Sequence, residues 1–288
     1  MPPLSNSIQT SVVGIFNAPF AAQAYTMSNH SNMSDYSRYF SLRQKVYLIT
    51  MSAERNSEIY ESLSGVVTYS GVDSLELMIA HGGDITCDSD AGVVTYKLTS
   101  EALGGGIQVL ADLVGIVTGN IFKFRMHGTL EMFQRRSVPR VDFSARMFQL
   151  RGNFSLAAFK KEWLRVMERL RGNAVLPGLV LQETEINLSA GGFGLTVDLK
   201  NRPTPLTMFF VALDEGLPVC TLAETIWEQA SEETVRYGCR FIHILKADQE
   251  RINSCVSDLT RKSGGTHLDY KRNWELVDKM VAEDRKPI

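Results

Sequence analysis

The sequence has few cysteines, no long apolar run and no excess of charge of one sign. No stretch approaches the roughly 20 apolar residues that a membrane-spanning helix needs, so no membrane span is expected. The four cysteines form no Cys-x-x-Cys pair and have no histidine at metal-ligand spacing, so neither a zinc site nor a disulfide framework is predicted. We interpret them as buried thiols of a reducing cytosol, which favours a cytoplasmic protein. A formal net charge of -2 argues against a general nucleic-acid-binding protein, which is typically strongly basic.

Motifs that carry enzymatic chemistry are also missing. There is no Gly-x-Ser-x-Gly and no His-Glu-x-x-His, and no set of nucleophile, base and orienting group can be assembled. Gly104-Gly105-Gly106 is not followed by Lys and Ser or Thr, so it predicts a turn and not a phosphate-binding loop. His127 and His243 lie within or beside strand patterns, which favours packing roles. We therefore expect no catalytic residue, no metal, no cofactor and no enzymatic activity.

The 288 residues exceed one average domain, so two modules are expected, and the 44% hydrophobic content is enough for two cores. Residues 1–39 are rich in Ser, Asn and Ala and predict a flexible leader, with Met27 or Met33 as alternative true starts. Residues 40–132 contain short β-branched runs between turn residues, several alternating with period 2, which predicts a compact N-terminal β domain. These runs are Val46 to Thr50, Leu63 to Tyr69, Leu75 to Ile79, Val93 to Leu98, Ile107 to Leu110, Leu113 to Thr118 and Ile121 to Met126.

The second half repeats this pattern with one helix inserted. Apolar residues recur at helical spacing from Phe154 to Arg171, which predicts either a helix that covers a barrel or a helix that binds a partner. A second helix is expected over Gln249 to Lys262, capped by Asp248. Residues 263–288 are expected to form a helical tail, with one more amphipathic helix from His267 to Arg285, for which a dimer contact and a frayed tail are the alternatives. The predicted strands cover 141–148, 179–188, 194–199, 206–213, 219–229 and 234–244, and such a series suggests a small closed barrel.

Two polar stretches stand out against this background. The first is Arg135-Arg136 followed by Arg140, at the joint between the predicted modules. Arginine offers a planar, permanently charged fork that matches phosphate oxygens or the O6/N7 edge of guanine. The second stretch places an amide at Asn187 and a hydroxyl at Ser189 before glycines that allow close approach to the backbone. Residues 131–172 carry ten Lys or Arg against four Asp or Glu, so an anion site in this region is expected.

Arg136-x-x-x-Arg140 followed by Asn187-x-Ser189-x-x-Gly192 resembles the signature of the PilZ domain, a bacterial receptor module for cyclic di-GMP. The resemblance covers residues 133–262 and implies a six-stranded antiparallel β-barrel followed by a C-terminal helix. The helix predicted from Phe154 to Arg171 departs from the minimal family pattern, so the expected fold is this barrel with an inserted helix and C-terminal helices. The β domain ahead of it is similar in layout to the flagellar-brake family, which implies a small barrel or split barrel over 40–132. The chain is thus expected to be mainly β, with a tail from residue 263.

The resemblance also implies a role for each motif residue. Arg136 and Arg140 present forks to the guanine Hoogsteen edges and the phosphates, and Arg135 adds a charge or a stacking plane. Asn187 accepts from the guanine donor edge, and Ser189 donates toward a phosphate or ribose oxygen. Gly191 and Gly192 keep the floor of the site free of side chains.

The function implied is a cyclic di-GMP receptor in which binding at the interdomain arginine loop favours one arrangement of the two domains. The rearranged surface then engages a protein partner, such as flagellar motor or exopolysaccharide machinery, with an output on motility or biofilm formation. The alternative is a degenerate PilZ adaptor that binds protein partners without nucleotide. The sequence is compatible with one or two bound nucleotides and with a homodimer.

Overall fold

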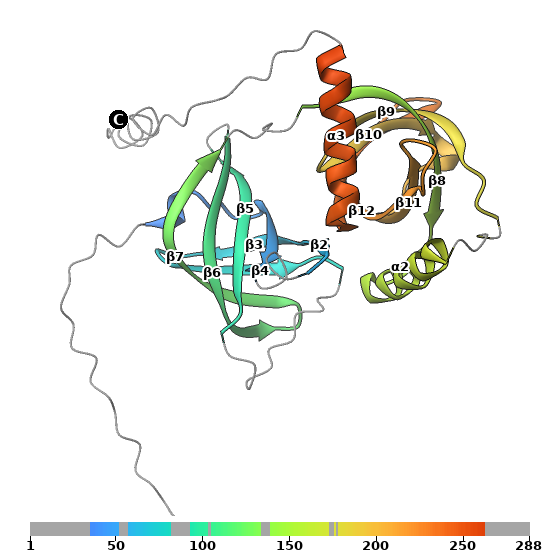
Figure 1. Cartoon of the computed structure of the whole chain (residues 1–288). Coiled ribbons are helices and arrows are strands. Elements are labelled where there is room, and N and C mark those ends of the chain that lie inside the picture. The colour runs from blue at the N-terminus through green and yellow to red at the C-terminus, as the bar shows by residue number, and fades with distance from the viewer. Residues whose placement is uncertain are drawn as a thin grey trace, which may run out of the picture. The chain divides into compact units, whose positions relative to one another are not determined.

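A computed structural model describes residues 35–51, 57–81, 93–102, 105–133, 139–172, 176 and 178–262. The described part is mainly β and contains two closed six-stranded antiparallel barrels, each with its own core (Figure 1). The predicted fold class is therefore confirmed.

The first barrel closes in the order β1-β3-β4-β7-β6-β5, because β5 pairs with β1. The two predicted runs at 107–110 and 113–118 form one strand, whose pairing with β7 shifts register at three places. Such bulges let a long strand bend around a small barrel. The strands are β1 (Lys45–Thr50), β3 (Leu63–Ser70), β4 (Ser74–Ile79), β5 (Thr95–Ala102), β6 (Gly105–Thr118) and β7 (Ile121–Phe133).

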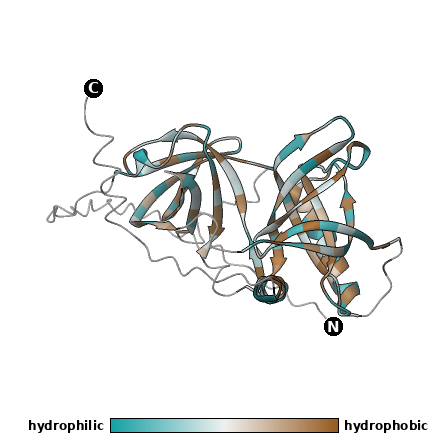
Figure 2. Cartoon of the chain, turned by 90° about the horizontal axis from the view of Figure 1, so that it is seen from above, coloured by the Kyte–Doolittle hydropathy of each residue, from teal (hydrophilic) through white to brown (hydrophobic). Residues whose placement is uncertain are grey.

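The core of the first barrel is made by side chains that alternate along its strands. Every second residue is buried from Tyr96 to Ser100 in β5 and from Phe122 to Met126 in β7, as the period-2 pattern predicts. Strands in Figure 2 likewise alternate between hydrophilic and hydrophobic residues. Tyr36 and Phe40 complete this core, and Tyr36 belongs to a short 3-10 helix, η1 (Tyr36–Arg38). The described part of the chain therefore includes the last residues of the predicted leader, Asp35 to Tyr39, whereas residues 1–34 lie outside the described residues.

The second barrel closes through pairing of β10 with β13. Its strand order is β10-β9-β8-β11-β12-β13, and a seventh strand, β2 (Ile59–Glu61), adds to β13. The 3-10 helix η2 (Leu199–Asn201) follows β10. The barrel strands are β8 (Val141–Arg151), β9 (Gln182–Ser189), β10 (Gly192–Asp198), β11 (Leu206–Ala212), β12 (Val219–Ala230) and β13 (Thr234–Leu245).

The inserted helix α2 (Leu156–Arg171) covers the outer face of β11 and β12. Ser155 caps its first turn by accepting from the backbone N–H of Ala158, and Gly172 ends it. The buried indole of Trp163 donates to the carbonyl oxygen of Cys220, 2.9 Å away. Every residue of β11 is buried, because one face lines the barrel interior and the other lies under α2. Of the two alternatives for this helix, the structure confirms the barrel cover.

The terminal helix α3 (Lys246–Lys262) follows β13 directly, and its Ile252 and Val256 join the core of the second barrel. The predicted capping role of Asp248 is wrong. Because the helix begins at Lys246, Asp248 lies within the first turn, where its carboxylate accepts from the Arg251 guanidinium 2.9 Å away. The predicted tail, residues 263–288, lies outside the described residues.

The strand β2 was not predicted, since three residues are too few to show a period. It lies in the connection between β1 and β3 but pairs with the last residues of β13, from His243 to Leu245. Glu61 at its end forms an ion pair with Lys160 of α2, and the Nδ1 atom of His243 lies 3.6 Å from the same carboxylate. These neighbours, His243 first, outweigh partial burial and lower the pKa of Glu61 to about 2. The connection of the first barrel is thereby tied to the second barrel.

Candidate functional site

The second motif and the end of the first lie on the outer face of the second barrel. Leu188 and Phe193 point into its core, so their neighbours Asn187, Ser189 and Gly192 face outward. Ser189 pairs directly with Gly192, and Asn187 pairs with Asp142 on β8. Val141 pairs with Leu188, so Arg140 lies opposite Ser189 when this register is continued by one residue. Sequence-distant motif residues are therefore brought side by side by strand pairing.

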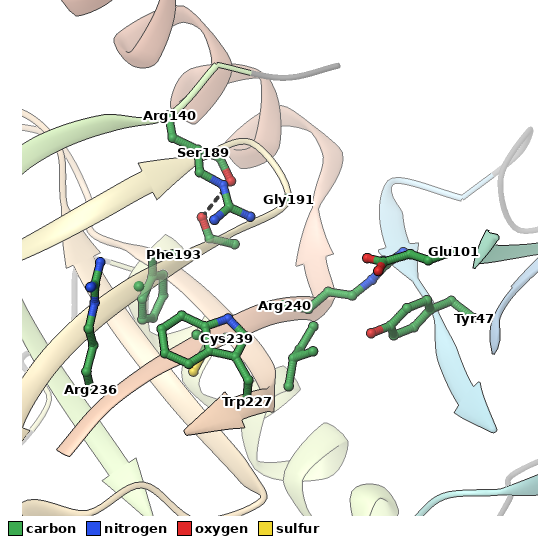
Figure 3. Close-up of a pocket in the computed structure, with 14 residues that line it drawn as sticks. Tyr47, Glu101, Arg140, Ser189, Gly191, Phe193, Trp227, Arg236, Cys239 and Arg240 are labelled. Atoms are coloured by element: carbon green, nitrogen blue, oxygen red, sulfur yellow. Dashed lines mark hydrogen bonds between the residues drawn. The ribbon is translucent and has the colours of Figure 1, made fainter. Parts of the chain in front are cut away.

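A cavity of about 510 Å³ opens over this face. Of the predicted residues, Arg140, Ser189, Gly191 and Gly192 line it, and Figure 3 shows Arg140 and Ser189 close together at one side. Asn187 does not line it but pairs with Gly194, which does. Arg135 and Arg136 lie outside the described residues. The full lining is Tyr47, Glu101, Arg140, Ser189, Gly191, Gly192, Phe193, Gly194, Ile226, Trp227, Arg236, Gly238, Cys239 and Arg240.

The two polar motif side chains already have hydrogen-bond partners. The Asn187 amide donates to Oδ1 of Asp142, 2.9 Å away, which leaves the amide oxygen as an acceptor for a ligand N–H. The Ser189 hydroxyl is buried and donates to the carbonyl oxygen of Gly192, 2.9 Å away, across the turn between β9 and β10. In this structure Ser189 therefore holds the turn. The predicted donation to a ligand oxygen requires that this hydrogen bond be exchanged.

The two motif glycines differ in what surrounds them. A Cβ atom at Gly192 would lie 2.0 Å from the carbonyl oxygen of Cys239 on the neighbouring strand, whereas a Cβ at Gly191 would meet nothing within 4 Å. Gly192 is thus required by the close approach of β10 and β13, in addition to leaving the floor without a side chain. Gly191 faces open space at the cavity.

The structure adds residues to the site that sequence reasoning missed. Gly194 pairs with Gly238 on β13, and Gly238 pairs with Trp227 on β12, so one row of residues continues across these strands. The Trp227 indole lies on Gly238, because a Cβ there would be 2.3 Å from its Nε1 atom. Trp227 is nevertheless 43% exposed. The result is an indole face beside a floor of glycines, which suits a flat aromatic base.

Two further arginines lie on the same outward face of β13. Arg236 pairs with Thr196 and Arg240 pairs with Gly192, in a strand whose alternate residues Val235, Tyr237 and Cys239 are buried. The period-2 alternation of β13 indicates from the sequence that Arg236, Gly238 and Arg240 share its outward face. Only the pairing of β13 with β10 shows that this face adjoins the second motif.

The charge of the cavity lining is carried by Arg140, Arg236 and Arg240 against Glu101. Burial raises the pKa of the Cys239 thiol to about 12, so this thiol stays neutral and is no nucleophile at ordinary pH. Burial likewise raises the pKa of Tyr47 to about 12, although the positive charge of the neighbouring Arg240 guanidinium acts to lower it. An anion is therefore favoured here, and the described residues include no group of three His, Cys, Asp or Glu that would hold a metal.

A comparison with protein-family models matches residues 160–258 to the PilZ domain. The chain contains a PilZ domain. The matched residues include the Asn187-x-Ser189-x-x-Gly192 motif, whereas Arg136 and Arg140 lie ahead of them. The PilZ family binds cyclic di-GMP as a ligand and consists of receptors and regulators rather than enzymes. The match of residues 160–258 to this family confirms the expectation of a non-enzymatic chain without a cofactor.

Solved structures that are similar to the chain include those of the following three proteins. The inhibitor of motility MotI/DgrA of Bacillus subtilis is 12% identical, with a TM-score of 0.32 over 77% of this chain and 99% of that chain. YcgR of Escherichia coli in complex with c-di-GMP is 15% identical, with a TM-score of 0.29 over 83% and 88%. MrkH of K. pneumonia in its apo state is 15% identical, with a TM-score of 0.33 over 77% and 89%. At these TM-scores the likenesses carry no argument, and no curated protein matches the chain.

Among the described residues, no helix is long and apolar enough to cross a membrane.

Proposed function

We propose that this chain is a cyclic di-GMP receptor and that the nucleotide binds in the cavity beside the PilZ motif. The observation that carries the proposal is that Arg140 and the Ser189–Gly192 turn line one cavity with Trp227 and two more arginines. Each chemical group of the ligand has a counterpart there. The phosphates and the O6/N7 edges of guanine match the arginine forks, and the guanine face matches the exposed indole.

The PilZ motif supplies the remaining contacts of this proposed complex. Asn187 has its amide nitrogen bound to Asp142, so its oxygen is presented to the guanine N1–H and amine. Arg135 and Arg136 lie outside the described residues; the resemblance assigns Arg136 to the guanine edges and the phosphates, and Arg135 to a further charge or a stacking plane. Gly191 and the Gly192 backbone form the floor on which the ligand lies.

Titration calorimetry with cyclic di-GMP tests the proposal. We expect saturable binding by the wild type, and a loss of about tenfold for Asn187→Ala, because a guanine donor then lacks its acceptor. Asn201→Ala is the matched control, since this asparagine lies in η2, away from the cavity lining. Absence of heat from the wild type at high nucleotide concentration would instead favour the adaptor that binds proteins without nucleotide.

The output that we propose is a change in the arrangement of the two barrels that exposes a surface for a cytoplasmic protein partner. A ligand can drive such a change only if it binds one arrangement more tightly than the other. The family resemblance favours flagellar motor or exopolysaccharide machinery as this partner, with motility or biofilm formation as the result. A second copy of the chain is the other candidate for the exposed surface.

Small-angle X-ray scattering of the full chain checks this rearrangement. We expect saturating cyclic di-GMP to change the radius of gyration, because the barrels adopt a different arrangement. Cyclic di-AMP at the same concentration is the control for nonspecific effects of a cyclic dinucleotide. Superimposable curves with and without cyclic di-GMP, under conditions where calorimetry shows binding, would contradict the switch.

A further inference from the structure

Arg240 of β13 lines the cavity between β10 and β12. It pairs with Gly192 of the PilZ motif on one side of β13 and with Glu224 of β12 on the other. Because directly opposed residues point to the same face, its side chain leaves the barrel next to the motif turn. This position follows from strand pairing within one barrel and makes Arg240 an immediate neighbour of whatever the motif binds.

The guanidinium of Arg240 lies over the aromatic ring of Tyr47 on β1 of the first barrel. Its central carbon is 3.7 Å from the ring centroid, and Figure 3 shows the side chain reaching toward Tyr47 and Glu101. Tyr47 is only 9% exposed, so its ring has little freedom to move. A guanidinium over an aromatic face makes a cation–π contact, and its N–H donors remain directed outward in the guanidinium plane. Both residues also line the cavity.

Strand β1 is held at this point by Glu224, the cross-strand neighbour of Arg240. The buried Glu224 carboxylate accepts from Lys45 Nζ at 2.8 Å and from the Ser64 hydroxyl at 3.0 Å, and His81 lies 3.6 Å away. Burial acts to raise the pKa of Glu224, but the hydrogen bonds from these partners outweigh it and lower the pKa. Lys45 precedes Tyr47 by two residues on the same strand, so the Glu224 contact also fixes the place of the ring.

The geometry points to Arg240 as a nucleotide-binding residue that the Tyr47 ring positions. The central carbon of the guanidinium lies over the ring, and in this proposal its N–H donors bind a phosphate or the guanine O6/N7 edge in the cavity. Tyr47 thus acts through Arg240 and needs no contact with the ligand. The inference rests on the proposed function and adds that the first barrel contributes to nucleotide affinity.

This arrangement makes the coupling between nucleotide and first barrel reciprocal. If the ring improves nucleotide binding by holding Arg240, then bound nucleotide strengthens the contact between Arg240 and Tyr47 by the same factor. The coupling free energy is the same in both directions. The effect of the Tyr47 ring on nucleotide affinity therefore also measures the effect of bound nucleotide on the contact between Arg240 and Tyr47. Nucleotide binding at the motif would in this way strengthen the contact of Arg240 with the first barrel.

The test is calorimetry of cyclic di-GMP with the full chain and five variants. We expect Tyr47→Phe to bind like the wild type, Tyr47→Leu to bind about fivefold more weakly and Arg240→Ala about tenfold more weakly. The double variant Tyr47→Leu/Arg240→Ala should bind like Arg240→Ala alone, because without the guanidinium the ring has nothing to position. Tyr69→Leu replaces an exposed tyrosine of β3 outside the cavity lining and should change nothing.

Four results would overturn the inference. An unchanged Kd for Tyr47→Leu, or an equal loss from Tyr47→Leu with and without Arg240, would show that the ring does not position the guanidinium. No binding by the wild type would overturn the proposed function together with the inference, so the two failures are distinguishable. If thermal unfolding shows that Tyr47→Leu does not fold, the affinity of Arg240→Lys for cyclic di-GMP is the deciding measurement, since lysine keeps the charge but lacks the planar fork. An affinity as low as that of Arg240→Ala supports the inference, and wild-type affinity overturns it.

Discussion

Replacing Gly192 with alanine is expected to destabilise the second barrel by about 2–4 kcal/mol. The added methyl group would lie 2.0 Å from the Cys239 carbonyl oxygen and 3.1 Å from the Cα atom of Arg240, and both contacts are with backbone. Backbone cannot turn aside as a side chain can, so β10 and β13 must separate. Their pairing closes the barrel, so its loss affects the whole domain. Urea or thermal unfolding followed by circular dichroism measures the effect.

Gly191→Ala is the matched control for this prediction. The position is adjacent in the same motif, yet a Cβ there would have nothing within 4 Å, so we expect stability within about 0.5 kcal/mol of the wild type. Equal destabilisation by both substitutions would show that general flexibility of the turn, and not the approach of β13, explains Gly192. A stable Gly192→Ala variant would show that the two strands can separate at little cost.

Much of the fold follows from local patterns in the sequence. Alternation along β5 and β7, and the helical stripe of α2, each give an element its buried face before any tertiary contact is known. The elements that were missed depend on distant partners. The short strand β2 exists because the end of β13 offers it an edge, and no period can reveal such a pairing from three residues. Asp248 failed as a cap because α3 continues straight from β13 and starts earlier than its best capping residue.

The residues of the candidate site likewise fall into two groups, those that the sequence predicts and those that depend on distant contacts. The motif predicts that Asn187, Ser189 and the glycines belong to the site, because these residues are close in the sequence and the pairing of β9 with β10 keeps them together. Trp227 and Arg240 could not be assigned to the site, since their place depends on which strands are neighbours in the closed barrel. Barrel closure is a long-range event that joins β10 to β13, and local patterns contain no information about it.

Closure also explains why the site lies where it does. The glycines 192 and 194 on β10 and Gly238 on β13 flank the closing seam, so the seam carries few side chains on its outer face. Arg140 stands on one side of that bare strip, three strands from Arg240 on the other, which is roughly 14 Å at the usual strand spacing. Two long side chains can bridge much of such a distance. A flat dianion lying on the strip would therefore contact guanidinium groups from both sides.

Arg140→Ala is expected to weaken cyclic di-GMP binding by about 30- to 100-fold. The guanidinium lines the cavity beside the Ser189 turn, and a charged fork on phosphate or guanine is worth about 2–3 kcal/mol once water is displaced. Calorimetry at moderate salt measures the loss. Arg136→Ala should show a loss of similar size, because the motif assigns the two arginines to the same ligand.

Two further variants separate the reasons for that loss. Arg140→Lys keeps the charge but removes the planar fork, so we expect it to recover only part of the affinity. Arg146→Ala is the matched control, because Arg146 is an exposed arginine of the same strand that does not line the cavity. If Arg140→Lys binds like the wild type, the site needs only positive charge. If Arg146→Ala is as weak as Arg140→Ala, long-range attraction of the basic region, and not a defined site at the end of β8, accounts for binding.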